Sequence, residues 1–350
     1  MLSSVKTILS SMMISLAALL FCASRGRAEQ PPWRPFSDDS PWNTPIPEKP
    51  AVDPDSETII GNIQNPYGDV GLWIGTPEWS VPVYYVDSDR IPWVQVTTPD
   101  DRPAGTGFGL EQQSRTAFVP IPDHAVPATG GDHHLAIVDI AKGIEWGMWY
   151  AVHLPDGWST ALGATADLKG TGERTPADQA NPWPLAHGPR ASGFPLMAGM
   201  IRVDEMKAGE IRHALAFAYM GCLATGYVSP ASTGQADLGE ERGMVRKPGT
   251  GLPMGGRIQL DPTLDVDNMP WARSTKIIAK ALQVYGAYCG DYGGACPSLC
   301  PESSPAQIAE WSRPFAGEPL LDRDDLHRTF TLDFAKKHFR VLEIGPLHGL

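Results

Sequence analysis

The sequence predicts a mainly β fold, a sandwich or a barrel, with one clear peripheral α-helix. Short runs rich in Val, Ile, Tyr and Trp follow one another from about residue 70 to residue 260, separated by Gly, Pro and Asp. The chain holds 36 Gly and 34 Pro in 350 residues, which favours many short strands joined by turns over a helical bundle. Only one segment shows a strong helical period.

Seven runs have the length, composition and flanking turn residues of β-strands. They are SVPVYYV (80–86), WVQVT (93–97), TAFVPI (116–121), HHLAIVDI (133–140), IEWGMWYAV (144–152), EIRHALAFAYM (210–220) and GRIQL (256–260). The helix is expected at about 274–286, where apolar residues recur from Ile277 to Tyr285. Ser274 would cap it and Gly286 would end it. A single helical turn closed by glycine is expected at 203–209.

The chain divides into three parts. Residues 1–28 have the features of a secretory signal peptide, with an early lysine, an apolar core and a small-residue exit. Residues 29–58 are a Pro-rich N-terminal strap whose aromatic side chains would pack on the body. Residues 59–350 are expected to form a single β-rich domain, and no later segment is apolar enough for a membrane span. The protein is therefore expected to be secreted, to the periplasm or the cell exterior.

Charge and motifs exclude several functions. The formal net charge is −12, and it becomes more negative once the three basic residues of the signal leave, so nucleic acid is not an expected partner. The sequence has no Gly-x-Ser-x-Gly elbow, His-Glu-x-x-His helix, P-loop or dinucleotide fingerprint, and no cofactor is expected. A metal held by Asp132 and one of the two following histidines is a weaker alternative, because adjacent strand residues point to opposite faces.

Four cysteines remain after removal of the signal, an even number in an exported chain. They are Cys222, Cys289, Cys296 and Cys300. This predicts two disulfides, with three possible pairings, that pin a Gly-rich loop at 289–300. A zinc site is the alternative, but the spacing of the last three cysteines fits none of the usual zinc patterns.

The stretch GGDHHLAIVD at 130–139 places an acid and two histidines at the mouth of a strand. A two-residue turn at Lys142-Gly143 would pair this strand with the run at 144–152. The resulting core face would carry Leu135, Ile137, Trp146, Met148, Tyr150 and Val152. The other face would carry His134, Ala136, Val138, Glu145, Gly147, Trp149 and His153, with Asp132 at the strand mouth. Acid, imidazole and indole groups around a glycine gap suit a sugar, although a solvated face without function is the alternative.

The candidate catalytic residues are Asp132, His134, Glu145 and His213, with His213 reaching in from the run at 210–220. A core position without a catalytic role is the alternative for His213, because apolar residues share its face. Substrate would bind to residues on the same face and in two polar, turn-rich segments. These are Trp149, His153, Arg190, Ser192, Arg202, Glu205, Arg257 and Asp291.

Several segments appear in a recognisable order: GDHHLAIVD, IEW, RASGFPLMAGMIRVDE, GEIRHALAF, LPMGGRIQL and ALQVYGAYCGD. This order resembles a family of secreted bacterial proteins of unassigned role, which share Asp-x-His, Gly-x-Ile-x-His-Ala-Leu-x-Phe and Pro-Met-Gly-x-Arg segments. The resemblance covers residues 40–293. The chain departs from it at CGDYG (289–293), where the family has Asp-Asn-Gly, and at RASG (190–193), which is shorter than the family's Ser-Ala-Asp loop. The resemblance implies no activity.

The residues themselves favour acid/base chemistry on a polysaccharide, and a glycoside hydrolase is the expected function. Hydrolysis needs two carboxyl groups across the scissile bond, and the candidates are Asp132, Glu145, Glu205 and Asp291. A polysaccharide lyase is one alternative, with His134, His213, Arg202 and Arg257 as its base and its carboxylate-neutralising groups. A non-catalytic carbohydrate-binding or cell-envelope protein is another. The acidic net charge favours a neutral glycan and hydrolysis.

Overall fold

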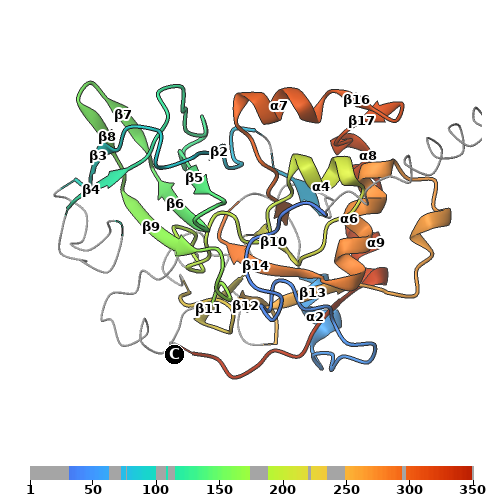
Figure 1. Ribbon diagram of the computed structural model, residues 1–350. Helices are drawn as coiled ribbons and strands as arrows, with labels where there is room; N and C mark the ends of the chain where they lie inside the picture. Colours follow the sequence, from blue (N-terminus) through green and yellow to red (C-terminus); the bar gives the residue numbers. More distant parts are fainter. Residues whose placement is uncertain are drawn as a thin grey trace, which may run out of the picture. The chain divides into compact units, whose positions relative to one another are not determined.

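The computed structural model describes residues 31–62, 72–75, 77–99, 108, 115–173, 188–219, 222–234, 249–293 and 297–348, without the side chains of 222–225. The predicted signal peptide at 1–28 lies outside these ranges. The fold is mainly β, as predicted, with many short strands in several sheets and fewer helical residues (Figure 1). Each of the seven predicted runs contains a strand.

Two four-stranded sheets form a sandwich. The first has the order β2 (Val83–Tyr85), β5 (Leu135–Asp139), β6 (Ile144–Trp149) and β9 (Leu162–Asp167). The second has the order β4 (Thr116–Val119), β3 (Val94–Thr97), β8 (Gly157–Ser159) and β7 (Val152–Leu154). Side chains from both sheets, such as Ile137 and Met148 from the first and Trp158 from the second, share one apolar core. Burial of this core stabilises the pair by about 25 cal/mol for each Å² removed from water.

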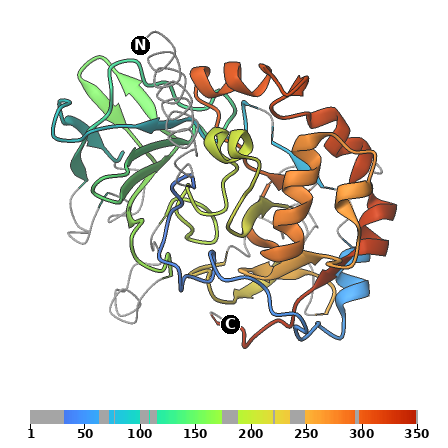
Figure 2. The same cartoon turned by 45° about the vertical axis from the view of Figure 1, so that its right-hand side comes forward.

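A six-stranded mixed sheet forms the other part of the body. Its order is β1 (Trp73–Ile74), β15 (Ser298–Leu299), β10 (Leu215–Ala218), β14 (Ala287–Asp291), β13 (Arg257–Leu260) and β18 (Phe339–Val341). Helices α6 (Arg273–Val284), α8 (Arg323–Thr329) and α9 (Leu332–His338) lie beside this sheet (Figure 2) and contact β13, β1 and β18 respectively. Residues 34–350 form one compact unit.

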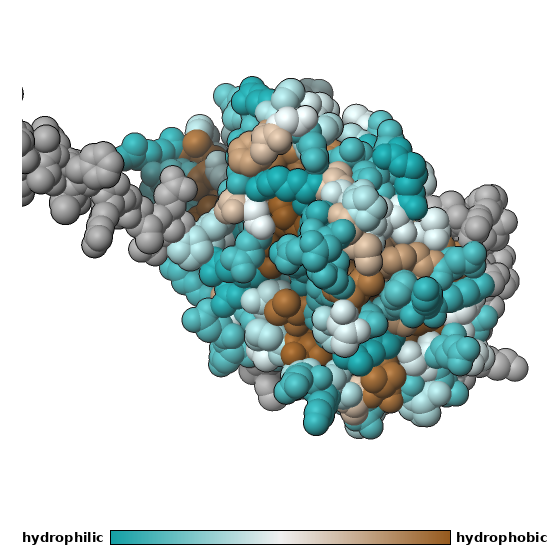
Figure 3. All heavy atoms as spheres, turned by 90° about the vertical axis from the view of Figure 1, so that its right-hand side faces the viewer, coloured by the Kyte–Doolittle hydropathy of each residue, from teal (hydrophilic) through white to brown (hydrophobic). Residues whose placement is uncertain are grey.

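The remaining elements are short. They are α2 (Ser56–Gly61), α4 (Val203–Ala208), η1 (Val266–Asn268), α7 (Pro305–Trp311), and the two-stranded sheets β11 (Cys222–Tyr227) with β12 (Leu252–Met254) and β16 (Pro314–Phe315) with β17 (Glu318–Pro319). On the side of the molecule where α6, α8 and α9 lie, the surface is mostly hydrophilic, and apolar side chains are visible in separate patches (Figure 3). Within the described ranges, no helix is long and apolar enough to cross a bilayer.

The two helical predictions hold with one correction. Helix α6 lies where its apolar period predicted it, and Gly286, at φ 68°, follows its C-terminus. Its N-cap is Ala272 and not Ser274, which is buried one residue inside the helix and accepts a hydrogen bond from the Asp322 N–H through its hydroxyl. The turn at 203–209 is α4, closed by Gly209 in the left-handed conformation.

The hairpin between β5 and β6 has the predicted faces but a different turn. Ile144 pairs with Asp139 and not with Ala141, so the turn has four residues and not two. Asp139 causes this, because its carboxylate accepts a hydrogen bond from the Lys142 N–H at 2.9 Å while its carbonyl accepts one from Gly143. The register shift is two residues, an even number, so the paired residues 135–139 and 144–148 keep their predicted faces.

The face of this hairpin that was expected to bind a sugar is buried along β5 and β6. It is therefore neither a face in contact with solvent nor an open gap at Gly147. Residues 188–202 are buried and mostly irregular, and they lie between β6 of the sandwich and β10 and β14 of the six-stranded sheet. A Cβ built on Gly147 would lie 3.0 Å from the Pro189 Cδ, so Pro189 occupies the gap that a sugar was expected to fill.

The aromatic residues of the N-terminal strap are buried against this part of the body. Trp42 is 1% exposed, and its ring meets those of Phe194 and Tyr288 edge-on, with centroids 4.7 and 4.9 Å away. Phe36 is also buried, and its backbone N–H donates to Leu168 O. The strap therefore covers the outer side of the buried segment at 188–202.

The prediction of two disulfides is wrong for Cys300, which carries a free thiol 3.7 Å from the Ser80 hydroxyl. Cys289 lies in β14, and its Sγ is 3.9 Å from the Met254 Sδ. Strand β10 separates β14 from β15, with Phe217 paired to Cys289 on one side and to Leu299 on the other. Strands two positions apart are about 10 Å apart, beyond the reach of about 7 Å for a disulfide. Cys296 and the Cys222 side chain lie outside the described part of the chain.

Candidate functional site

Five ionisable side chains gather where the buried segment begins, at the junction of the two sheet systems. They are Asp132 and His134 at the entry to β5, Glu145 on β6, Arg190 in the segment, and Asp291 at the end of β14. The charge of Arg190 influences the pKa of His134, of Glu145 and of Asp291. Arg190 is therefore the centre of the cluster, and all five members were predicted as site residues.

Glu145 has a structural position in this cluster. Its side chain is fully buried, and its two oxygens accept hydrogen bonds from the backbone N–H groups of Leu196, at 2.7 Å, and Met197, at 2.9 Å. Burial raises the pKa of Glu145 to about 7, against the lowering effect of these two bonds. The carboxyl group is 0% exposed and engaged by two backbone donors, so it holds the segment at 196–197, and a catalytic role for Glu145 stays a prediction.

Asp291 is a half-buried member of the cluster. Burial raises the pKa of its carboxyl to about 6; Arg190 and the N–H groups of Tyr292 and Ala191 lower it, and the charge of Asp132 raises it. The two N–H groups bond the same oxygen, Oδ1, at 2.9 and 3.2 Å. Asp291 is therefore held in a fixed position by one oxygen, beside a second carboxylate.

His134 is buried and neutral. Burial lowers the pKa of its ring to about 4, with Asp132 opposing the shift and Arg190 adding to it. Its Nε2 is buried and has no hydrogen-bond partner among the described residues, and the same is true of the Arg190 Nε. A buried polar atom without a partner costs about 1–3 kcal/mol, so a water or ligand atom at this point would be favoured.

Asp132 is half-buried, and its Oδ1 accepts a hydrogen bond from the indole N–H of Trp149 at 3.2 Å. This bond links the carboxylate to the half-buried tryptophan that was predicted as a sugar platform. The backbone takes a left-handed conformation at His133, whose φ is 42°, and not at the glycines before Asp132, where a bend was expected. Gly130 is required for another reason, since a Cβ there would lie 2.5 Å from the carbonyl oxygen of Glu78.

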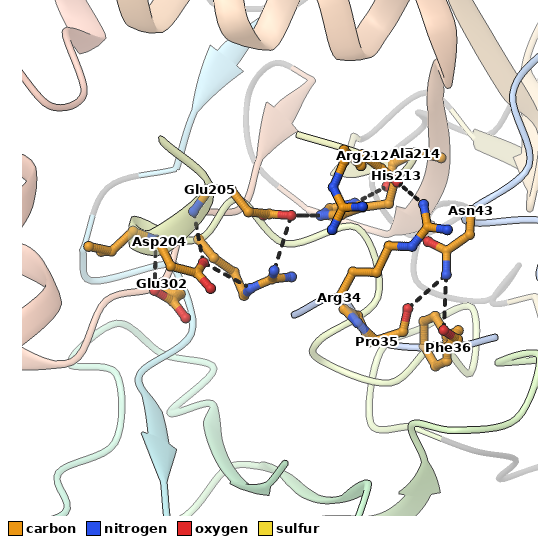
Figure 4. A network of polar contacts seen from close by, with 12 residues as sticks. Arg34, Pro35, Phe36, Asn43, Asp204, Glu205, Arg212, His213, Ala214 and Glu302 are labelled. Atoms are coloured by element: carbon orange, nitrogen blue, oxygen red, sulfur yellow. Dashed lines mark hydrogen bonds and ion pairs between the residues drawn. The ribbon is translucent and has the colours of Figure 1, made fainter. Parts of the chain in front are cut away.

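His213 does not join this cluster, contrary to the expectation. Its Nε2 contacts the two carboxylate oxygens of Glu205 at 3.1 and 3.2 Å, and its Nδ1 faces Ala214 O at 2.9 Å (Figure 4). His213 precedes β10, whereas Ala218, at the other end of β10, pairs with Asp291. Five residues of extended chain span about 16 Å, so the two groups lie at opposite ends of the strand.

His213 belongs to a second, buried polar network. Arg202 contacts Glu205 at 3.1 Å and Asp204 at 3.3 Å, and its side chain is 1% exposed. Glu302 accepts from the Val203 N–H at 3.1 Å and from the Tyr85 hydroxyl, and burial raises its pKa to about 7. Tyr85 and Glu302 were missed in the sequence, because neither lies in a motif and only the fold brings β2 to the segment at 301–304.

Three predicted binding residues contact other parts of the protein and not the cluster around Arg190. His153 is exposed on β7, in the other sheet of the sandwich, and stacks on Trp158 with ring centroids 4.6 Å apart. Ser192 is fully buried and donates its hydroxyl proton to Gly290 O. Arg257 donates to Tyr285 O and Thr44 O and lies over the Tyr288 ring. The expected rim at 190–193 is thus buried, because β14 and the backbone at 232–233 bond to it.

The cluster around Arg190 offers two half-buried carboxyl groups, a neutral imidazole and a guanidinium. Among the described residues, no group of three His, Cys, Asp or Glu side chains is arranged to hold a metal ion. Carboxyl and imidazole groups of this kind could transfer protons to or from a bound molecule.

Comparisons with known proteins found no family model, no curated protein and no solved structure that matches this chain. The resemblance to secreted bacterial proteins therefore rests on the quoted motifs alone.

Proposed function

We propose that the protein is a secreted glycoside hydrolase that cleaves a polysaccharide with Asp132 and Asp291. The observation that carries the proposal is the Asp291 carboxyl, whose pKa is raised to about 6 by burial and by the charge of Asp132. Glycoside hydrolysis requires such a pair, with one carboxyl that stays protonated and one that acts as a carboxylate. The indole of Trp149, bonded to Asp132, supports a sugar ring beside the pair.

In the proposed reaction, Asp291 donates its proton to the glycosidic oxygen as the bond from that oxygen to the anomeric carbon breaks. Asp132 then acts in one of two ways. It attacks the anomeric carbon to form a glycosyl ester, which water hydrolyses while the Asp291 carboxylate takes the proton of that water, or it takes a proton from a water that attacks the anomeric carbon directly. Arg190 and the two backbone N–H donors keep Asp291 in place. His134 lies next to Asp132 and holds the buried side of the site.

The test is a screen of the purified protein on neutral and acidic polysaccharides, with products identified by mass spectrometry. On a cleaved substrate, Asp132→Asn and Asp291→Asn should each lower turnover by about a hundred- to ten-thousand-fold. Asp156→Asn is the matched control, since Asp156 is exposed in the tight turn between β7 and β8. Full activity in either site variant would refute the assignment.

A lyase is the second candidate. It is favoured by His134, whose Nε2 has no hydrogen-bond partner among the described residues, and by the charge of Arg190 close to that ring. A lyase needs a neutral base and a cation that neutralises the uronate carboxylate, and these two groups have that chemistry. An unsaturated uronic end in the products would establish the lyase, and added water would establish the hydrolase. Retention of a glycan without products would indicate a binding protein.

A further inference from the structure

Three aromatic side chains surround Asp132 on its outer side. Trp79 is 58% exposed, Tyr150 is 42% exposed, and Trp149 is half-buried. The Trp79 ring lies along the backbone of Gly131, the residue before Asp132; a Cβ on Gly131 would be 3.6 Å from it. The rings of Trp149 and Tyr150 are 5.9 Å apart. Large exposed aromatic rings beside a carboxylate are unusual on a solvated surface and indicate a binding surface.

The backbone turns Tyr150 outward at a cost in strain. Alternation along β6 predicted Tyr150 in the core, but its φ is 59°, in the left-handed region that bulky residues rarely adopt. His133, opposite it, is also left-handed at φ 42°, and hydrogen bonds Tyr150 N to Asp132 O and Ala151 N to His133 O fix the pair. Paired strain of this kind clusters at functional sites.

His133 completes this surface. Its ring meets the Tyr150 ring at nearly a right angle, with centroids 5.2 Å apart. Its Nδ1 lies 3.0 Å from Ala128 O, and because a carbonyl oxygen only accepts, Nδ1 carries the proton. In the neutral ring, Nε2 is then the acceptor, and it can bond a hydroxyl group of a ligand.

We propose that Trp79, Tyr150 and Trp149 form an aromatic strip that binds consecutive sugar rings of a neutral polysaccharide and leads them to Asp132. Flat indole and phenol faces pack against the apolar faces of pyranose rings, and His133 Nε2 accepts from a sugar hydroxyl. The carboxyl groups of Asp132, bonded to Trp149, and of Glu78, next to Trp79 in the chain, disfavour a polyanionic ligand, as does the net charge of −12. This inference rests on the proposed function for its substrate class.

The test measures binding separately from turnover, by affinity electrophoresis in gels that contain β-glucan, xylan, galactomannan, alginate or polygalacturonate. Tyr150→Asn removes the ring but keeps a residue that tolerates positive φ, and Trp79→Ala removes the most exposed ring of the strip. Phe118→Ala is the matched control, because Phe118 is 59% exposed on β4 in the other sheet. Each strip variant should bind a neutral glycan about three- to tenfold more weakly, whereas the control should bind as the wild type does.

The outcomes separate this inference from the proposed function. Weaker binding in the strip variants with no cleavage of any glycan supports the strip and refutes the hydrolase. Cleavage with unchanged binding and unchanged KM in both strip variants refutes the strip and keeps the hydrolase. Retardation by alginate or polygalacturonate alone would overturn the assignment of a neutral ligand.

Discussion

Asp291, at the end of β14, lies close enough to Asp132, at the entry to β5, for the negative charge of Asp132 to raise the pKa of Asp291. The two residues come from different sheets, and the buried segment at 188–202 brings Arg190 to both sheets.

The pKa of Asp291 should fall when the charge of Asp132 is removed. In the wild type that pKa is about 6, and Asp132 is one of the causes that raise it. Because the proposed acid must be protonated, wild-type activity should decline as pH rises through about 6. In Asp132→Asn, carbon-13 NMR of the Asp291 carboxyl should show titration at a lower pH. An unchanged titration would mean that the two groups are not coupled.

Replacement of Gly147 by alanine should destabilise the fold and lower activity. The new Cβ would lie 2.7 Å from a Glu145 carboxylate oxygen and 3.0 Å from Pro189. Overpacking of this kind costs about 1–3 kcal/mol, measured by urea unfolding, and it would push Arg190 away from the sheet. Gly345→Ala is the control, since a Cβ there has nothing within 4 Å. Equal stability of the two variants would contradict the close contact.

Glu302 should make the fold less stable at alkaline pH. Its pKa is raised from 4.5 to about 7 by burial, so the folded state binds the proton more tightly than the unfolded state. Stability from this group is therefore complete below about pH 4.5 and is lost as pH rises through 7, by at most about 3 kcal/mol. Between pH 5 and 8, Glu302→Gln should lose less stability than the wild type in urea titrations.

The control for this experiment is Glu343→Gln, because Glu343 is exposed. Its stability should follow the wild-type curve at every pH. Parallel curves for Glu302→Gln and the wild type would show that Glu302 is not protonated in the folded protein at neutral pH.

Cys300 should react with a maleimide after denaturation without reductant. The thiol is free in the structure and contacts the Ser80 hydroxyl. Mass spectrometry of the peptide that contains residue 300 should find the label. A disulfide-linked peptide at this position would contradict the free thiol.

The sequence by itself determined the β-rich class, the position of α6 and the two faces of the β5–β6 hairpin. These are local properties, since alternation and the helical period depend only on neighbouring residues, and the even shift at Asp139 left the faces unchanged. The helix α7 also has a local signal in the sequence, the capping box formed by Ser304 and Gln307.

Only the tertiary structure decided which of the candidate residues meet. Burial of 188–202 brought Arg190 and Asp291 to Asp132, fixed Glu145 to the Leu196 and Met197 backbone, and filled the Gly147 gap with Pro189. Strand order placed His213 at the far end of β10 with Glu205 and kept Cys289 apart from Cys300. These outcomes depend on pairings between segments far apart in the chain, and a local pattern of residues carries no information on sheet order or strand direction.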